Sequence, residues 1–476
     1  MLLAAFALSA TVSNPAALPN IIYIMADDLG YGEVGAYGQT KIKTPNIDRI
    51  AAEGIKFSQH YSGSTVCAPS RCVLLTGKHT GHSYIRDNSE IGGWGEFDGE
   101  GQEPLPDDTF TIGRMLQEKG YATAAIGKWG LGGPGTSGAP NNQGFDYFFG
   151  YLCQRRAHNY YPKSLWENDT EVFTGNGWFD SHQKLAGDPT DPASYAPFQG
   201  KDYAPDMMAD RALKFIQDNK DRPFFLYFAT PVPHAALQVP NDSLAQYSGQ
   251  FDTEPYVGDR GYLPHMEPRA AYAAMVTRMD RDIGRMLDLL DSLGLANNTL
   301  VVFTSDNGPT FNGGTDSEFF NSTAGLRGLK TSLYEGGIRV PMVARWPGKI
   351  APGSETDHVS AFWDVLPTLA EIVSADVPAD VDGLSFLPTL TGGEQASHDF
   401  LYWEFHGRKS QAVRFGDYKA IRLYKQGKPE PIEIYNLAKD VAESNDLAAS
   451  RPELVAQAAV LMERRFRSHR TRWNFD

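Results

Sequence analysis

Continuous apolar runs alternate with segments of helical periodicity along most of this chain. Residues Asn20–Ala26, Pro223–Phe228 and Thr299–Ser305 are apolar at nearly every position, which is typical of strands buried on both faces. A further strand is predicted over Tyr121–Ile126. Strands of this kind, separated by helices, predict an α/β fold with a large, mostly parallel sheet sandwiched by helices.

Helices are expected between these strands. One begins at Thr44-Pro45 and stops at Gly54, and two more are predicted over Thr111–Lys119 and Asp206–Asn219. A fourth carries an apolar stripe at helical spacing, which we interpret as core packing rather than a cofactor surface. The stripe consists of Met275, Met279, Ile283, Met286, Leu287 and Leu290.

The pattern changes after Gly392-Gly393. Short strands separated by turns follow, and then a helix from about Pro452 to Arg465. We therefore expect a large α/β domain over residues 20–392 and a small C-terminal antiparallel α+β subdomain over residues 393–476. The short strands are predicted at Leu401–Phe405, Ala412–Phe415, Tyr418–Leu423 and Ile432–Tyr435.

The N-terminus and the cysteines indicate the cell compartment. The run from Met1 to Ala10 is apolar and too short to span a bilayer. We interpret residues 1–19 as a signal peptide or its remnant and expect an exported protein, periplasmic or secreted, with no transmembrane segment. Cys67, Cys72 and Cys153 are too few for a disulfide scaffold, and Cys72 and Cys153 either pair or stay free.

The charge balance restricts the partners. The 476 residues include 43 Lys and Arg against 58 Asp and Glu, which gives a net charge of −15. This balance argues against nucleic acid and against anionic membranes as partners. An anionic ligand would therefore need a locally basic pocket. The oligomeric state cannot be read from the pattern.

Several polar residues follow the predicted strands, where α/β sheets bind their ligands. Asp27-Asp28 and Asp306-Asn307 each close an apolar run, Lys128 follows a third strand, and His234 comes shortly after a fourth. Asp and Asn oxygens without a His or Cys pattern favour a hard cation, Ca²⁺ or Mg²⁺, over zinc. The alternative is ordinary turn chemistry, which each cluster favours when it is taken singly.

The segment from Thr65 to Lys78 suggests a reactive residue. Pro69 suits the first turn of a helix, which puts Cys67 at the helix N-terminus, where anions are favoured. Arg71 lies one turn further, and its guanidinium group can clamp a tetrahedral oxyanion. The alternatives are a buried structural thiol for Cys67 and a surface ion pair for Arg71.

This segment resembles a known family signature. Cys67-Ala68-Pro69-Ser70-Arg71, followed by Leu74-Leu75-Thr76-Gly77, is similar to the Cys-x-Pro-Ser-Arg motif of the type I, formylglycine-dependent sulfatases of the alkaline phosphatase superfamily. Further family elements appear in the same order along nearly the whole chain. They are Asp27-Asp28, Gly127-Lys128-Trp129, Pro233-His234, Asp306-Asn307-Gly308 and Gly328-Leu329-Lys330.

The resemblance implies a modified nucleophile and a metal. A formylglycine-generating maturation enzyme would oxidise Cys67 to formylglycine, whose hydrate attacks the sulfur of a sulfate ester and then expels sulfate through its second hydroxyl. A thiol could not complete that second step. Asp27, Asp28, Asp306 and Asn307, with an oxygen at position 67, would hold Ca²⁺ or Mg²⁺, and the cation would polarise the sulfate.

The resemblance also assigns the remaining polar residues. Arg71 and Lys78 would stabilise the formylglycine, and Lys128 and Lys330 would neutralise the sulfate oxygens. His234, helped by Lys330, would protonate the departing alcohol oxygen. Taken alone, each lysine is more often a solvated surface residue.

One position departs from the family pattern. The family has a histidine two residues after the Lys128 position, where it helps the second half of the reaction, but this chain has Gly130 there. Another group supplies the base, or the subfamily differs. His79 and His82 are candidates on proximity, although loop histidines without a role are the stronger interpretation.

The substrate is the least defined part of this interpretation. Arg155, Arg156 and His158, with Tyr160 and Tyr161, occupy a polar and aromatic loop. The arginines would recognise a carboxylate or second sulfate of a sugar and the tyrosines would stack on its ring, or the group is interdomain packing. The motifs are more similar to those of carbohydrate sulfatases and arylsulfatases than to those of steroid sulfatases.

Three functions therefore stand open. The first is hydrolysis of sulfate esters on a small molecule or glycan, with galactose or N-acetylgalactosamine sulfates as the expected substrates. The second is a phosphonate monoester or phosphodiester hydrolase of the same superfamily. The third is a non-catalytic protein that binds sulfated glycans through an unmodified Cys67.

Overall fold

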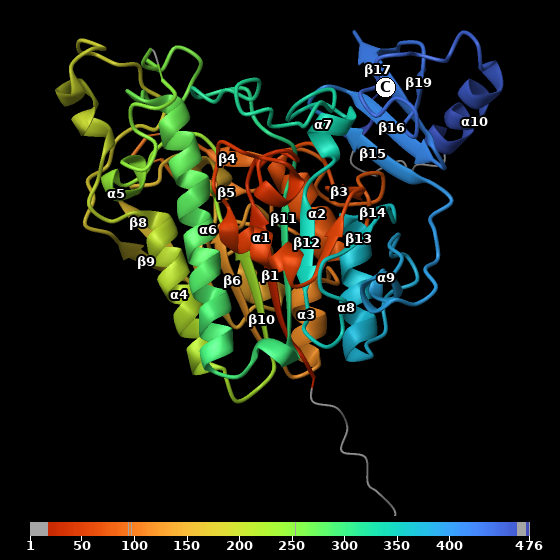
Figure 1. The fold of residues 1–476 in the computed structure, drawn as a ribbon, viewed down its shortest axis with the longest axis horizontal. Helices are drawn as coiled ribbons and strands as arrows, with labels where there is room; N and C mark the ends of the chain where they lie inside the picture. The colour runs from red at the N-terminus through yellow and green to blue at the C-terminus, as the bar shows by residue number, and fades with distance from the viewer. Residues whose placement is uncertain (1–17, 94, 97, 253, 464–472, 476) are drawn as a thin grey trace, which may run out of the picture.

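A mixed ten-stranded sheet forms the centre of the molecule (Figure 1). The computed structural model describes residues 18–93, 95–96, 98–252, 254–463 and 473–475. The predicted signal peptide, residues 1–19, lies outside the described residues except for its last two. Export therefore stays a prediction.

The sheet has the strand order β13-β2-β12-β11-β1-β10-β6-β7-β8-β9. Its central strands β11, β1, β10, β6 and β7 run parallel, whereas β12 at one side and β8 and β9 at the other are antiparallel to their neighbours. The prediction of a mostly parallel sheet is confirmed. The strands are β1 (Asn20–Ala26), β2 (Ile55–Phe57), β6 (Ala122–Lys128), β7 (Tyr147–Tyr151), β8 (Ser164–Glu167), β9 (Thr170–Phe173), β10 (Phe224–Ala229), β11 (Thr299–Ser305), β12 (Met342–Arg345) and β13 (Ser354–Thr356).

Two hydrophobic cores lie on the two faces of this sheet. Alternate side chains of β1 enter different cores: Ile22 and Ile24 pack with α1, α4 and α6, and Ile21 and Met25 pack with α2, α3 and α8. The predicted apolar stripe, within residues 275–290, lies on α6 and is buried in the core that contains Ile22 and Ile24. The helices are α1 (Pro45–Ala52), α2 (Cys67–Thr76), α3 (Ile112–Glu118), α4 (Ala204–Asp218), α5 (Asn241–Leu244), α6 (Pro268–Ser292), α7 (Glu335–Ile338), α8 (Val365–Val373) and α9 (Leu387–Thr391).

A small antiparallel sheet and α10 (Pro452–Glu463) form the C-terminal part, at the upper right in Figure 1. This confirms the predicted antiparallel subdomain, while the boundary near residue 392 stays a prediction. The two parts share a core, because Leu401, Trp403 and Phe405 belong to the same hydrophobic cluster as β1. The strands are β15 (Leu401–Phe405), β16 (Ser410–Phe415), β17 (Tyr418–Lys425), β18 (Lys428–Pro429) and β19 (Glu433–Asn436).

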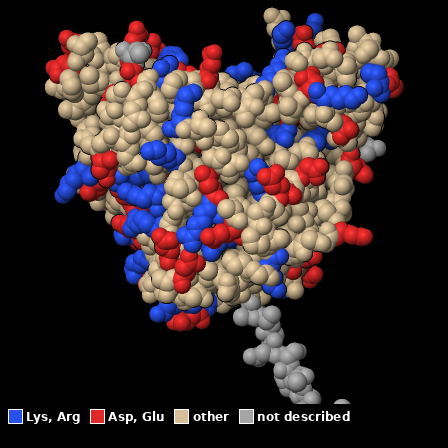
Figure 2. Space-filling view, viewed as in Figure 1, with Lys and Arg blue, Asp and Glu red and all other residues tan. Residues whose placement is uncertain are grey.

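The surface carries charges of both signs (Figure 2), and the cysteines are free thiols. On the face seen in Figure 2, basic and acidic side chains are interspersed and neither sign forms a continuous field. Within the described residues, none of the helices is both long and apolar enough to cross a lipid bilayer. Cys67, Cys72 and Cys153 are all buried free thiols, so Cys72 and Cys153 do not pair.

Candidate active site

The site lies where two neighbouring parallel strands end. Asp27 and Asp28 follow β1, and Asp306 and Asn307 follow β11, which pairs with β1 in parallel. The amide of Asp306 donates to the carbonyl of Ala26 at 3.0 Å, and the amide of Asp28 donates to Oδ1 of Asp306 at 3.1 Å. Asp28 has a φ of 66°, which is rare for a residue with a side chain. The strand register therefore places these side chains together, as the sequence predicts.

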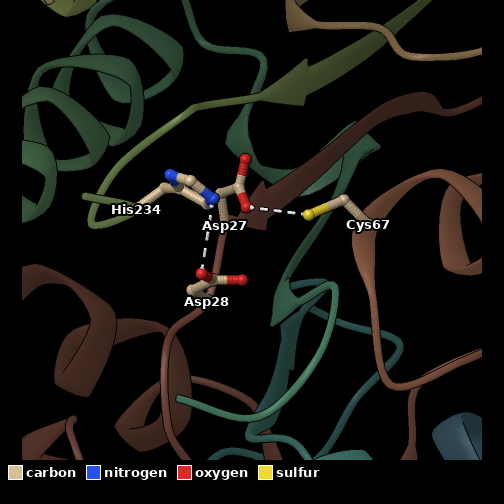
Figure 3. A group of neighbouring side chains, drawn as sticks. All are labelled: Asp27, Asp28, Cys67 and His234. Atoms are coloured by element: carbon tan, nitrogen blue, oxygen red, sulfur yellow. Dashed lines mark hydrogen bonds and ion pairs between the residues drawn. The ribbon is translucent and has the colours of Figure 1, made fainter. Parts of the chain in front are cut away.

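Cys67 is the first residue of α2 and is 2% exposed. Its Sγ lies 3.5 Å from Oδ1 of Asp27, 3.3 Å from Nζ of Lys128 and 3.5 Å from Nζ of Lys330 (Figure 3 shows the contact with Asp27). Burial, and then the charge of Asp27, raise the pKa of the Cys67 thiol to about 12. At neutral pH the sulfur therefore keeps its proton and is a weak nucleophile.

Arg71, one turn further along α2, is fully buried and binds carboxylates. Its Nη2 lies 2.7 Å from Oδ2 of Asp306 and 3.3 Å from Oδ2 of Asp27, and Nη1 donates to the carbonyl of Lys128. Because these contacts occupy the guanidinium group, Arg71 positions two carboxylates. The alternative of a surface ion pair is wrong, since both partners are fully buried.

Two lysines complete the charge balance. Nζ of Lys128 lies 2.6 Å from Oδ2 of Asp27, and Nζ of Lys330 lies 2.7 Å from Oδ1 of Asp28. Burial alone would raise the pKa of Asp27, but Lys128 and nearby cations outweigh it and hold that pKa well below its usual range. Burial and the charge of Asp27 instead raise the pKa of Asp306 to about 6. Three carboxylates thus face three cations. Together with Asn307 they form what we call the active-site cluster: Asp27, Asp28, Asp306, Asn307, Arg71, Lys128 and Lys330.

One atom in this cluster lacks a partner. The amide nitrogen of the Asn307 side chain donates to Oδ1 of Asp28 at 2.7 Å, but its Oδ1 is buried without a hydrogen-bond partner among the described residues. A buried acceptor without a donor is costly unless a ligand satisfies it. Three carboxylates and this amide oxygen form the donor set that Ca²⁺ or Mg²⁺ prefers, so the residues present fit such a cation.

His234 faces the cluster from the loop after β10. Its Nδ1 donates to the carbonyl of Ala235 at 2.5 Å, which leaves Nε2 to face Oδ2 of Asp28 at 3.6 Å (Figure 3). Burial, and then the charge of Lys330, lower the pKa of His234 to about 4. The ring is therefore fixed in one orientation with one nitrogen directed at the site.

A second histidine stacks on His234. The rings of His158 and His234 are 4.9 Å apart and inclined by 12°, and Nδ1 of His158 lies 3.0 Å from Nε2 of His182. The amide of Tyr262 donates to Nδ1 of His182 at 3.3 Å, so Nε2 of His182 carries the proton and donates to His158. By the same reasoning the neutral form of His158 carries its proton on Nε2. We call His158, His182, His234 and Tyr262 the histidine cluster.

The space beside Gly130 is filled by another side chain. A Cβ at Gly130, which has a φ of +84°, would lie 2.9 Å from Cγ of Gln154. Nε2 of Gln154 donates at 3.2 Å to Oδ1 of Asn88, which also accepts the amide proton of Ala68 next to Cys67. A histidine at position 130 would therefore displace Gln154. The titratable side chain next to His234 is instead that of His158.

His79 and His82 do not reach this site. Both contact Asp382, with Nδ1 of His82 at 2.7 Å and Nε2 of His79 at 3.7 Å from Oδ1. The amide of Gly81 donates to Nδ1 of His79 at 3.1 Å, so the proton of neutral His79 lies on Nε2, which faces Asp382. A metal ion binds a ring nitrogen that carries no proton, so the group of His79, His82 and Asp382 is not arranged for a metal ion.

Lys78 also lies elsewhere, which corrects the role expected from the resemblance. Its Nζ is 2.5 Å from Oδ2 of Asp380, and its side chain is 30% exposed. Cys67 begins α2 and Lys78 follows its end. A helix of this length separates them by roughly 15 Å.

Arg155 and Arg156 donate hydrogen bonds to backbone carbonyl groups and do not contact the active-site cluster. Nη1 of Arg155 donates to the carbonyls of Gly92 at 2.5 Å and Gly93 at 3.0 Å. Nη2 of Arg156 donates to the carbonyl of Asp98 at 2.8 Å. Of the three predicted substrate residues, only His158 touches a residue of the site.

The C-terminal part supports the segment that carries Lys330. Nη1 of Arg327 donates to Oη of Tyr435 at 2.9 Å and to the carbonyl of Glu443 at 2.8 Å. Oη of Tyr334 donates to Oε2 of Glu433 at 2.5 Å. Sequence reasoning missed these contacts, and it also missed Asn88, Gln154, His182 and Tyr262, none of which has a local pattern.

The fold and the site together define a class of protein. Hard oxygen donors and basic side chains surround one buried reactive position at the carboxyl edge of an α/β sheet. This is the arrangement of a hydrolase that binds an anionic ester group.

Comparison with known proteins identifies the family. Residues 19–375 match the family model described as Sulfatase, and residues 329–470 match the model described as N-sulphoglucosamine sulphohydrolase, C-terminal. The chain belongs to the sulfatase family and is a sulfuric ester hydrolase. The resemblance in the sequence is confirmed.

Several relatives match nearly the whole chain. The N-acetylgalactosamine-6-O-sulfatase of Bacteroides thetaiotaomicron is 31% identical over 94% of this chain and 92% of its own. Arylsulfatase A of Homo sapiens is 32% identical over 95% of this chain and 88% of its own. The crystal structure of Ps i-CgsB in complex with k-i-k-neocarrahexaose is similar with a TM-score of 0.75 and 28% identity, covering 94% of this chain and 92% of that one.

Proposed function

We propose that this sulfatase releases sulfate from a carbohydrate, with galactose or N-acetylgalactosamine as the sulfated sugar. The observation that carries the proposal is the position of Cys67, whose Sγ lies within 3.5 Å of both lysine ammonium groups. Two cations at the reactive atom suit a sulfate group. The sugar is supported by the similarity to the N-acetylgalactosamine-6-O-sulfatase of B. thetaiotaomicron.

The proposal includes conversion of Cys67 to formylglycine by a maturation enzyme. Support comes from the sulfatase motif around Cys67 and from the raised pKa of its thiol, which makes the unmodified side chain a weak nucleophile. When present, the hydrated aldehyde supplies an oxygen nucleophile and a second hydroxyl through which sulfate can leave.

Asp27, Asp28, Asp306 and Asn307, with the oxygen at position 67, are the proposed ligands of a Ca²⁺ ion, or of Mg²⁺. The partnerless Oδ1 of Asn307 supports this assignment. When bound, the cation supplies Lewis acidity at the sulfate oxygens. Arg71 keeps the carboxylates of Asp27 and Asp306 ionised and oriented.

The other side chains of the site bind sulfate and move protons. Lys128 and Lys330 neutralise the sulfate oxygens, since their ammonium groups lie at the reactive atom. In its cationic form His234 carries a proton on Nε2 and gives it to the alcohol oxygen that leaves, while Nδ1 stays bonded to the carbonyl of Ala235. We assign to His158, which stacks on His234, the role of base that a histidine at position 130 would have. Its Nδ1 would accept the proton of the second hydroxyl group after releasing the hydrogen bond from His182.

The test is sulfate release from a panel of sulfated mono- and oligosaccharides. The protein is co-expressed with a formylglycine-generating enzyme, and Cys67→Ala is the blank. Release from galactose or N-acetylgalactosamine sulfates that disappears in the blank is expected. Faster turnover of an aryl phosphonate than of any sulfate, or no release when mass spectrometry shows conversion of Cys67, would contradict the proposal.

A further inference from the structure

We propose that a cavity next to the histidine cluster binds an uncharged sugar unit joined to the sulfated one. The substrate is then an oligosaccharide whose sulfated unit has a neutral neighbour. This inference rests on the proposed function and deepens it, because it names the chemistry of the leaving group.

The cavity has a volume of about 410 Å³, and two of its lining residues lie next to histidine-cluster residues along the chain. They are Asn159, directly after His158, and Ser181, directly before His182. Neighbouring Cα atoms are about 3.8 Å apart, so the cavity begins one residue from the histidine cluster. Two of its wall residues are therefore chain neighbours of the histidine cluster, which includes His234, the proposed acid for the alcohol half of the ester.

The walls of the cavity suit a sugar ring. Phe173 at the end of β9 is 64% exposed and Trp178 is 39% exposed, and both line the cavity with Trp166. Several exposed aromatic side chains that gather in one cavity form an apolar patch, and their flat faces can pack against the apolar face of a pyranose. The volume lies within the usual range for small-ligand sites.

The charge of the cavity excludes an acidic sugar. Five carboxylates and three basic groups line it: Glu96, Asp98, Glu100, Glu171 and Asp180, with Arg155, Arg156 and Lys163. Acidic groups already engage two of the bases, because Nζ of Lys163 lies 2.6 Å from Glu96 and Nε of Arg156 lies 3.4 Å from Glu100.

Arg155, the third base, donates to two backbone carbonyls. The remaining field is negative, so it repels a uronate or a second sulfate, whereas carboxylate oxygens accept hydrogen bonds from neutral hydroxyl groups. On this proposal Arg155 and Arg156 do not recognise an acidic sugar.

The aromatic wall is tested with Trp178→Ala and the matched variant Trp178→Phe. The substrates are a sulfated monosaccharide and a disaccharide with the same sulfated unit and a neutral neighbour. Trp178→Ala should lower kcat/KM for the disaccharide about tenfold and leave the monosaccharide within twofold, while Trp178→Phe retains most activity on both. Equal effects on the two substrates, or none on the disaccharide, would overturn the inference.

The charge is tested with Glu171→Gln, which removes one acidic group without changing the shape of its side chain. The wild type should prefer a neutral neighbour over a uronate, and the variant should reduce that preference about threefold. A wild-type protein that prefers the uronate would contradict the proposal.

A binding measurement separates this inference from the proposed function. Cys67→Ala protein is titrated with the unsulfated neutral disaccharide, and chemical-shift changes are followed in the protein. Binding that Trp178→Ala weakens supports the cavity even if no sulfate ester is ever cleaved. Absence of binding overturns the cavity even if sulfate release from monosaccharides is normal.

Discussion

Two groups of buried charges in this molecule, one larger than the other, differ in what completes them. The active-site cluster has three carboxylates and three cations. The second group, which we call the C-terminal charge cluster, consists of Lys419 with Glu335 and Glu443, all fully buried, at 2.9 and 3.0 Å from the two carboxylates. In both groups the carboxyl pKa values diverge, since burial raises that of Glu443 while Lys419 holds that of Glu335 below its usual range despite burial.

The difference lies in what completes each cluster. In the C-terminal charge cluster, Oη of Tyr61 donates to Glu335 at 2.7 Å and the amide of Glu335 donates to Glu443 at 2.6 Å, so the protein itself supplies the donors. In the active-site cluster, the buried Oδ1 of Asn307 has no partner in the described chain. Burial of charge and perturbed pKa values do not by themselves mark function, whereas a partnerless amide oxygen set among three carboxylates fits a cation.

The largest expected effect comes from Cys67→Ala. Sulfatase activity should fall by a factor on the order of 10³ or more, because the reactive side chain is lost. The measurement is sulfate release under saturating substrate. Cys72→Ala, which removes another buried thiol of α2, is the control and should keep its activity per folded molecule. Similar losses in both variants would show that packing of α2, not the atom at position 67, controls activity.

Lys419→Met should act on stability instead. Removing the shared cation leaves two buried carboxylates without their partner, and the free energy of unfolding should drop by about 3–5 kcal/mol. Urea unfolding followed by fluorescence measures this. The exposed Lys425, 3.6 Å from Glu430, provides the control Lys425→Met, for which we expect a change within about 0.5 kcal/mol. If the Lys419→Met protein were as stable as that control, the C-terminal charge cluster would not stabilise the fold as we expect.

Calcium should stabilise only the active-site cluster. Protein stripped with a chelator should gain about 2.7 kcal/mol of unfolding free energy at calcium near a hundred times its Kd. In Asn307→Ala this gain should shrink below about 1 kcal/mol at the same calcium concentration, because one ligand atom is gone. Thermal unfolding with and without calcium measures both values. An equal gain in the two proteins would place the cation elsewhere.

The smallest expected effect is that of Lys78→Ala. The pair with Asp380 is partly exposed, so its loss should change stability by less than about 1 kcal/mol and leave kcat/KM within twofold. Steady-state kinetics on one sulfated substrate checks this. A tenfold loss of activity would return Lys78 to the reaction centre, where the family resemblance places it.

Most of the fold was predictable because the central strands carry a strong local signal. The apolar runs at β1, β10 and β11 mark strands buried on both faces, and their parallel pairing brings Asp27 and Asp306 to one edge. The short strands β12 and β8, which run antiparallel to the central strands, are too brief to stand out in the sequence. The mixed character of the sheet edges therefore became visible only in the structure.

The site was predictable only where a contiguous motif carries it. Cys67 and Arg71 lie in one segment, and the strand ends supply the carboxylates. Gln154, in a short 3-10 helix, and His182, in a loop, come near the site along paths that depend on the whole fold, so no local spacing reveals them. Lys78 was wrongly placed in the site by its nearness to the motif in sequence, because the helix α2 lies between it and Cys67.

The support of the Lys330 segment has a consequence for the order in which the molecule is made. Arg327 and Tyr334, on either side of Lys330, are held by Tyr435 and Glu433 of the C-terminal sheet. A ribosome adds those partners about a hundred residues later, after every strand of the large sheet has emerged. The nascent chain can assemble its scaffold early, but the lysine that touches Cys67 is fixed in place only near the end of synthesis.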